Sequence, residues 1–161
     1  DDPERLAGSE YLELVHGLVV GRPSINLELE AAVQRACRWA VKKGLVSSAH
    51  DCSDGGLAVA IAESCISGDV GIEAEFETPT RWDAALFGEQ QSRIVVSVRP
   101  HNLGALEEIC RAEGVPWVRL GQVGGNRIVM PGLMDVSVNE ATEIWRHGIE
   151  KSLATEAARP A

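Results

Sequence analysis

A short run of polar, acidic and small residues lies between an apolar segment and a stretch with the apolar spacing of a helix. It consists of His50, Asp51, Cys52, Ser53, Asp54, Gly55 and Gly56. Glycines at a helix start remove side chains where the first unpaired N–H groups emerge, so a phosphate or another anion can approach. A plainer interpretation also stays open, in which Ser53 or Asp54 is an ordinary N-cap and the glycines ease a tight turn.

A second polar run precedes the segment richest in β-branched residues. Its members are Glu89, Gln90, Gln91, Ser92 and Arg93. Polar side chains at the end of a central strand are where open α/β sheets bind ligands. Glu89, Gln91 and Arg93 are therefore candidate cleft residues. The plainer interpretation is a polar loop in which Arg93 pairs with a nearby acid.

No residue has the sequence context of a catalytic group or a metal ligand. His50 could act as a general base, because the reference pKa of a histidine side chain lies near neutrality, but without a nucleophile or metal partner a hydrogen-bonded structural histidine is favoured. The cysteines at positions 37, 52, 65 and 110 form no C-x-x-C pair and have no histidine at metal-ligand spacing. The sequence also lacks G-x-x-x-x-G-K-S/T and G-x-G-x-x-G, so it has no self-contained nucleotide loop. We assign no catalytic residue and no metal.

The elements around the first run follow a helix–strand–helix pattern. Asn26 is expected to cap a helix that ends at Gly44, and residues 45–50 are expected to form a strand. A second helix should begin at the two glycines and end at Gly68. Residues 71–77 alternate between apolar and acidic side chains, which predicts a strand with one solvated face.

The second run is expected to lie between a short helix at 80–87 and a strand at 93–99 that is buried on both faces. A helix over 101–113 follows. Residues 117–123 and 127–130 are predicted strands, and Gly124-Gly125-Asn126 between them predicts a hairpin. Ser137 and Glu140 have the spacing of a capping box. The helix after them is expected to face inward through Ala141, Ile144, Trp145 and Ile149.

This order of elements predicts an α+β fold, a mixed β-sheet with helices packed on it in α/β/α layers. The 161 residues, 45% of them hydrophobic, suit one globular domain. Residues 1–25 are interpreted as a linker from a preceding domain outside this chain, 26–152 as the α/β domain, and 153–161 as a tail.

Charge and hydropathy exclude several classes of partner. The net charge is −9, without a long run of one sign, which argues against nucleic acid as a ligand. No apolar stretch reaches the roughly 18 residues that span a bilayer, so no membrane partner is expected. The start of the chain has no signal-peptide pattern, and the free cysteines suit a reducing compartment, which together predict a cytoplasmic location.

Several motifs in a fixed order carry a family resemblance. They are Gly8-Ser9-Glu10-Tyr11-Leu12, His16-Gly17, Gly44-Leu45, the segment from Ser48 to Ala60, and the segment from Leu86 to Arg93. Over roughly residues 5–150 the chain resembles phosphoribosylformylglycinamidine synthase, the large glutamine-dependent ligase of purine biosynthesis. The likeness is to the C-terminal domain of its second half, a domain type shared with aminoimidazole ribonucleotide synthetase.

The resemblance implies a reaction in which ATP phosphorylates the amide oxygen of formylglycinamide ribonucleotide. Ammonia released from glutamine then displaces the phosphate, which gives formylglycinamidine ribonucleotide. ATP and Mg²⁺ would be bound mainly by the preceding domain, so this fragment would be inactive alone. The implied partners are that domain, the two substrates, a glutaminase and small accessory subunits.

The same resemblance implies that both polar runs line a nucleotide or substrate cleft. The residues concerned are His50, Asp51, Ser53, Asp54, Gly55, Gly56, Glu89, Gln91 and Arg93. Glu89-Gln90-Gln91 matches a motif usually written Glu-Ser-Gln, and Gln90 departs from it. Two alternatives stay open: another superfamily member, such as aminoimidazole ribonucleotide synthetase, selenophosphate synthetase or thiamine-phosphate kinase, and a degenerate domain with a structural role.

Overall fold

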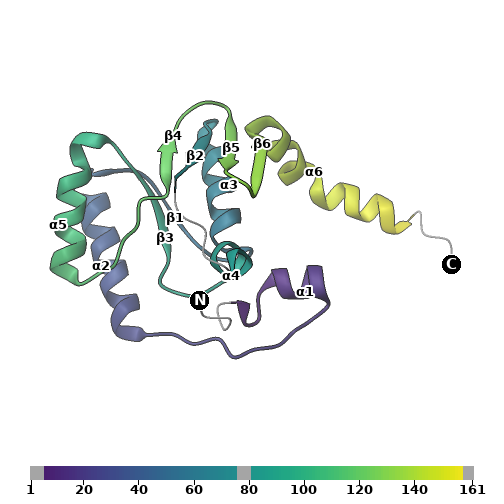
Figure 1. Cartoon of the computed structure of the whole chain (residues 1–161), viewed down its shortest axis with the longest axis horizontal. Helices are drawn as coiled ribbons and strands as arrows, with labels where there is room; N and C mark the ends of the chain where they lie inside the picture. The colour runs from purple at the N-terminus through teal and green to yellow at the C-terminus, as the bar shows by residue number, and fades with distance from the viewer. Residues whose placement is uncertain (1–5, 76–80, 158–161) are drawn as a thin grey trace. The chain divides into compact units, whose positions relative to one another are not determined.

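A computed structural model describes residues 6–75 and 81–157 of the chain (Figure 1). The chain divides into two compact units. The first unit comprises Asp1–Ser64 and Phe76–Arg119, and the second comprises Cys65–Glu75 and Leu120–Ala161. Because each unit has its own contacts, the two are described in turn.

The first unit begins with a helix that the sequence pattern does not predict, α1 (Glu10–His16). Ser9 caps it, with its hydroxyl accepting a hydrogen bond from the N–H of Leu12 at 3.4 Å. Gly17 ends it in the left-handed conformation, with φ of 65°. Residues 1–25 were expected to form only a connecting segment, and α1 shows that part of this segment has regular structure of its own.

Two helices lie side by side in this unit, α2 (Leu27–Lys42) and α5 (Leu103–Glu113) (Figure 1). The predicted cap of α2 is confirmed, because the side-chain oxygen of Asn26 accepts the N–H groups of Glu28 and Leu29. The buried face of α2 consists of Ala32, Val33, Ala36 and Ala40. Such small side chains allow a close approach between the helices.

The strands β1 (Val46–Asp51) and β3 (Ile94–Val98) pair antiparallel and form a two-stranded sheet. The prediction that residues 93–99 are buried on both faces is wrong, because all of β3 is only half-buried. The described residues place no further strand beside this pair, so its side chains stay partly accessible. In the register, His50 faces Val95 and Asp51 faces Ile94, which brings the two polar runs to the same end of the sheet.

Three further helical segments belong to this unit in whole or in part. They are α3 (Gly56–Gly68), of which only the residues up to Ser64 fall in the first unit, α4 (Trp82–Phe87) and the short 3₁₀ helix η2 (Pro100–Asn102). The helix predicted at 80–87 is thus confirmed over the residues described there. The helix predicted from 101 begins as the 3₁₀ turn and continues as α5, which Gly114 ends as expected.

The second unit contains a four-stranded mixed sheet in the order β4-β2-β5-β6. Its strands are β2 (Ile72–Ala74), β4 (Gly121–Val123), β5 (Arg127–Met130) and β6 (Met134–Ser137). The predicted hairpin between 117–123 and 127–130 is wrong, because β2 lies between β4 and β5. Gly71 and Gly121 permit this arrangement: a Cβ on either would clash with the backbone of Arg127 or Glu73.

The hairpin of this unit joins β5 to β6, and Gly132 in its turn has φ of 77°. β2 keeps the predicted alternation, with Ile72 and Ala74 buried and Glu73 exposed. The rest of that predicted strand, Phe76 and Glu77, lies outside the described residues. Ile128 and Met130 on β5 are among the most deeply buried side chains of the chain.

The last helix, α6 (Val138–Ala157), starts as predicted, with the Ser137 hydroxyl accepting the N–H of Glu140 at 3.1 Å. Its expected inward face is wrong, because Ile144, Trp145 and Ile149 are 60%, 59% and 81% exposed. The helix contacts β6 near its start and then extends away from the strands of its unit (Figure 1). It also continues through residues 153–157, where the pattern predicts a tail.

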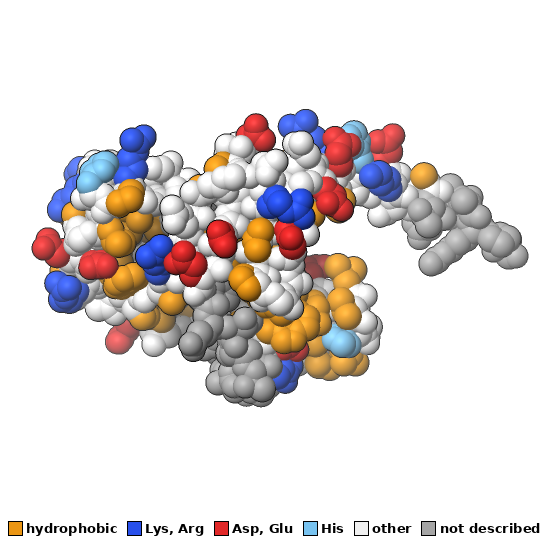
Figure 2. Space-filling view, turned by 45° about the horizontal axis from the view of Figure 1, so that its top comes forward, with side chains coloured by type: hydrophobic (Ala, Val, Ile, Leu, Met, Phe, Trp, Pro, Cys, Tyr) orange, Lys and Arg blue, Asp and Glu red, His pale blue; other side chains and the backbone are white. Residues whose placement is uncertain are grey.

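The α+β class with a mixed sheet is confirmed, with the strands divided between two sheets. Within the described ranges, no helix is both long enough and apolar enough to cross a membrane. On the face shown in Figure 2, acidic and basic side chains are intermixed rather than gathered by sign.

Candidate functional site

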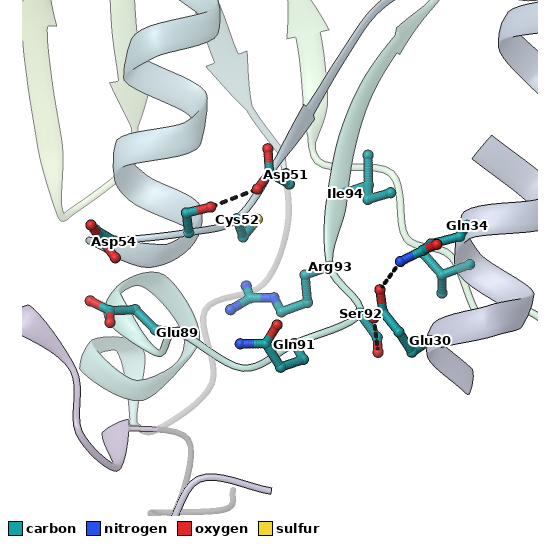
Figure 3. Close-up of a pocket in the computed structure, with 12 residues that line it drawn as sticks. Glu30, Gln34, Asp51, Cys52, Asp54, Glu89, Gln91, Ser92, Arg93 and Ile94 are labelled. Carbon is teal, nitrogen blue, oxygen red and sulfur yellow. Dashed lines mark hydrogen bonds between the residues drawn. The ribbon is translucent and has the colours of Figure 1, made fainter. Parts of the chain in front are cut away.

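A cavity of about 410 Å³ opens in the first unit, where β1 leads into α3 and the second polar run leads into β3 (Figure 3). Its lining residues are Glu30, Val33, Gln34, Asp51, Cys52, Ser53, Asp54, Glu89, Gln91, Ser92, Arg93 and Ile94. Both polar runs contribute to this lining, because the antiparallel pairing of β1 and β3 brings them together.

Most of the proposed cleft residues lie on this cavity, and three do not. Asp51, Ser53, Asp54, Glu89, Gln91 and Arg93 line it. His50, Gly55 and Gly56 lie outside the lining. The imidazole Nε2 of His50 instead lies 3.2 Å from the Glu63 carboxylate on α3, and Nδ1 lies 2.7 Å from the Asp51 carbonyl. These contacts give His50 the surroundings of a hydrogen-bonded structural residue.

The turn before α3 has the backbone that its two glycines predict. Gly55 and Gly56 have φ of 77° and 65°, in the left-handed region. The N–H of Gly56 donates to the Ser53 carbonyl at 2.9 Å. The N–H of Gly55 donates to Glu89 Oε1 at 2.8 Å. A carboxylate of the protein itself therefore lies where the sequence pattern suggests an external anion.

Glu89 makes a second bond with the same oxygen. The N–H of Glu10, the first residue of α1, donates to Glu89 Oε1 at 2.9 Å. One carboxylate oxygen thus joins the start of α1 to the turn before α3. In Figure 3 the Glu89 side chain extends toward Asp54, whereas Gln91 lies beside Arg93.

Arg93 is held by the end of α4. Its guanidinium donates to the carbonyls of Gly88 at 3.0 Å and Ala85 at 2.9 Å. Carbonyls in the last turn of a helix lack intrahelical partners and carry partial negative charge, so a cation is favoured there. In these two bonds Arg93 contacts backbone carbonyls rather than the nearby acid that the plainer interpretation expects, and it holds the loop to the end of α4.

On the opposite side of the cavity, Ser92 is fixed to α2. Ser92 has φ of 66°, uncommon for a residue with a side chain, and its hydroxyl donates to Glu30 Oε2 at 2.6 Å. Gln34, one turn later on α2, donates to the other carboxylate oxygen at 2.5 Å. The Ser92 hydroxyl, together with the Gln34 amide, lowers the pKa of Glu30 below its ordinary value.

Asp51 has a similar local partner. The Ser53 hydroxyl donates to Asp51 Oδ2 at 2.6 Å, and this hydrogen bond lowers the pKa of Asp51. Burial raises the pKa of the neighbouring Cys52 thiol. Cys52 therefore stays a neutral thiol and lacks the environment of a reactive nucleophile.

The cavity is acidic. Glu30, Asp51, Asp54 and Glu89 contribute carboxylates to its lining, against the single guanidinium of Arg93. Such a lining repels a bare phosphate and favours a polar ligand that is neutral, cationic or metal-bound. Yet the described residues contain no group of three or more His, Cys, Asp or Glu that could hold a metal ion.

Sequence reasoning missed the α2 wall of this cavity. Glu30, Val33 and Gln34 all lie on α2, far from either polar run in the sequence. The only local signal is the spacing of Glu30 and Gln34 by one helical turn, which is common on exposed helix faces. Ser92 belonged to the second run but was not among the candidate cleft residues.

The chain is similar in sequence to one subunit of a purine-biosynthesis enzyme from several bacteria. The chain is 44% identical over 164 residues to phosphoribosylformylglycinamidine synthase subunit PurL of Anaeromyxobacter dehalogenans, a match that covers 95% of this chain and 22% of that protein. The same subunit of Thermomicrobium roseum is 45% identical over 152 residues, covering 91% of this chain and 21% of that protein. The chain thus spans about a fifth of the length of these relatives.

Solved structures of the same subunit also match this chain. PurL of Thermotoga maritima complexed with FGAR matches with a TM-score of 0.60 and 25% identity, covering 70% of this chain and 21% of that one. The same protein complexed with AMPPCP matches at a TM-score of 0.63 and 24% identity, over 76% of this chain and 24% of that one, which shows the shared fold. Residues 3–131 match the family described as AIR synthase related protein, C-terminal domain, and the chain therefore belongs to that family.

Proposed function

We propose that this chain is the C-terminal domain of a phosphoribosylformylglycinamidine synthase. The enzyme would convert formylglycinamide ribonucleotide, ATP and glutamine to formylglycinamidine ribonucleotide in purine biosynthesis. The observation that carries the proposal is 44% identity over 95% of the chain to a PurL subunit. PurL structures complexed with FGAR and with AMPPCP, a nucleotide analogue, add support.

In this proposal the cavity forms one wall of the nucleotide or substrate cleft. Gln91 is the lining residue best suited to contact a ligand: among the described residues its exposed amide makes no side-chain hydrogen bond, and it can both donate and accept. Glu89, Ser92 and Arg93 hold the loop on either side of it. Phosphates and Mg²⁺ would be held mainly by the preceding part of the enzyme, as the family resemblance implies, and the acidic lining of this wall would repel a phosphate that carries no metal ion.

The proposal includes partners and a location. The chain would work with the preceding domain of the same polypeptide, a glutaminase and small accessory subunits, in the cytoplasm. A Thermotoga maritima structure named PurLQS, which matches at a TM-score of 0.61 with 22% identity, is the basis for expecting such subunits. The separate 161-residue chain would show no ATP turnover with formylglycinamide ribonucleotide and ammonia.

A chimera tests the proposal. The corresponding segment of Anaeromyxobacter dehalogenans PurL would be replaced by this chain, and formylglycinamidine ribonucleotide formation from ammonia and ATP would be measured. Activity within about tenfold of the parent, a barrier change near 1.4 kcal/mol, is expected. A chimera that folds and remains inactive, while the same exchange in aminoimidazole ribonucleotide synthetase supports activity, would overturn the proposal in favour of that alternative.

One observation favours the other alternative, a degenerate domain with a structural role. The N–H of Gly55 is already bonded to Glu89, so in this structure it is not available to a ligand phosphate. If the role is structural, the chimera should keep its activity when Gln91 is replaced by Ala. The cleft proposal instead predicts a loss of about tenfold or more for the same variant, because a ligand hydrogen bond is removed.

A further inference from the structure

Glu89 lies where three parts of the first unit meet. Its carboxylate oxygen accepts N–H groups from positions 79 and 34 residues earlier in the sequence, Glu10 and Gly55. Bonds of backbone N–H groups to an ionised carboxylate are among the stronger hydrogen bonds in proteins. A single side chain in the second polar run therefore bonds both to α1 and to the turn that leads into α3.

Aromatic side chains also hold α1 against the end of α4, next to the residues that Glu89 contacts. The Tyr11 ring on α1 stacks on Phe87 at the end of α4, with 4.8 Å between centroids and 10° between planes. Trp82 lies edge-on to Phe87, 6.3 Å away. Gly88, which follows Phe87, is in turn bonded through its carbonyl to Arg93. One ring stack and the Glu89 carboxylate thus both hold α1 against residues 87–89.

We infer that Glu89 is a positioning residue rather than a ligand-contacting one. It docks the start of α1 against the turn before α3 and fixes the loop from which Gln91 lines the cavity. The inference deepens the proposed function and rests on it for the meaning of the cavity as a cleft wall. The docking itself, however, can be measured without substrate, nucleotide or turnover.

The docking of α1 needs the acceptor oxygen of Glu89, whereas its negative charge is surrounded by other acids. Asp54 lies next to Gly55 and presents a second carboxylate to the same cavity, and like charges repel. Two N–H groups donate to one oxygen of Glu89 and hold its carboxylate in this position. An amide oxygen can accept the same two bonds without the charge, so Glu89→Gln should keep the docking, whereas Glu89→Ala removes the acceptor altogether.

Tyr11 provides the readout, because it is the only tyrosine in the chain. In the full chain, the NMR signals of its ring are shifted by the stacked Phe87 and report directly on the docking of α1. Amide exchange at Glu10 and Gly55 reports on the two bonds. Amide signals of α2 and α5, which lie elsewhere in the unit, show whether a variant is folded.

For Glu89→Ala we expect loss of the Tyr11 ring shift and exchange roughly tenfold faster at both amides, with α2 and α5 unchanged. Glu89→Gln should restore the ring shift and most of the protection. Asp54→Asn, which changes the neighbouring carboxylate of the same cavity, should alter neither. The inference is overturned if Glu89→Ala leaves Tyr11 and both amides unchanged, or if Glu89→Gln fails as completely as Glu89→Ala. Either result would leave the proposed enzyme function standing, because no step of the measurement involves a ligand.

Discussion

Replacing Gly56 by Ala tests how closely the turn before α3 packs on α4. A Cβ at this position would lie 2.6 Å from the Gly88 carbonyl oxygen and 2.8 Å from that of Leu86. Both atoms are backbone at the end of α4, so relief requires movement of the chain rather than of a flexible side chain. Overpacking of this kind costs about 1–3 kcal/mol. The left-handed φ of 65° adds about 1–2 kcal/mol for any residue with a Cβ.

Gly44 provides a matched control in the same unit. It has the same φ of 65°, and a Cβ there would meet nothing within 4 Å. Gly44→Ala therefore carries the backbone cost alone, and the effect of Gly→Ala on the unfolded chain is common to both variants. We expect Gly56→Ala to lower the free energy of unfolding by about 1–3 kcal/mol more than Gly44→Ala does.

Urea unfolding followed by circular dichroism measures the difference, with the midpoint and slope of each variant compared with the parent chain. Equal losses for the two variants would refute the reasoning, because the contact with α4 would then contribute nothing. A larger loss for Gly44→Ala would refute it more strongly.

Two further predictions concern the loop around Gln91. Arg93→Ala removes both bonds to the carbonyls of Gly88 and Ala85 and should lower the free energy of unfolding by about 2 kcal/mol. The control variant Arg99→Ala, at an exposed arginine, should not change the free energy of unfolding measurably. The pKa of Glu30 is lowered in the folded chain by the Ser92 hydroxyl, so its stabilisation is complete above the ordinary value of 4.5 and is lost as the pH falls below it. Glu30→Gln should therefore be less stable than the parent near neutral pH, with the gap closing in acid, as urea titrations at several pH values would show. A gap that is independent of pH, or an equal one for the exposed Glu108→Gln, would contradict this.

Local features of the fold could be predicted from the sequence, because their causes lie within a few residues. Asn26 caps α2 through its own side chain, and Gly114 ends α5 through its left-handed backbone. The capping hydroxyl of Ser137 is likewise three residues from its partner. Each of these elements forms where its signal is, whatever the rest of the chain does.

Features that depend on distant partners could not be predicted in this way. The Gly124-Gly125-Asn126 turn is a strong local hairpin signal, yet β2, some fifty residues earlier in the chain, separates the two strands it joins. Gly71 and Gly121 make that insertion possible, and their role is visible only once the neighbouring backbones are known. The prediction that β3 is buried on both faces failed for a related reason, because the burial of a strand depends on how many strands its sheet contains.

In the candidate site, some features follow from neighbouring residues and others depend on distant partners. Glycines before α3 predict a left-handed turn with accessible N–H groups, and the structure has that turn. What occupies the N–H of Gly55 is decided by Glu89, a residue in the other polar run, through the pairing of β1 with β3. A carboxylate and a phosphate oxygen satisfy the same helix terminus, so the local sequence cannot distinguish an internal anion from an external one. The identity of the anion follows from the register of two strands. Two polar runs that each suggest a ligand site therefore bond to one another through Glu89 and the N–H of Gly55, while the exposed amide of Gln91 lines the cavity without a side-chain hydrogen bond among the described residues.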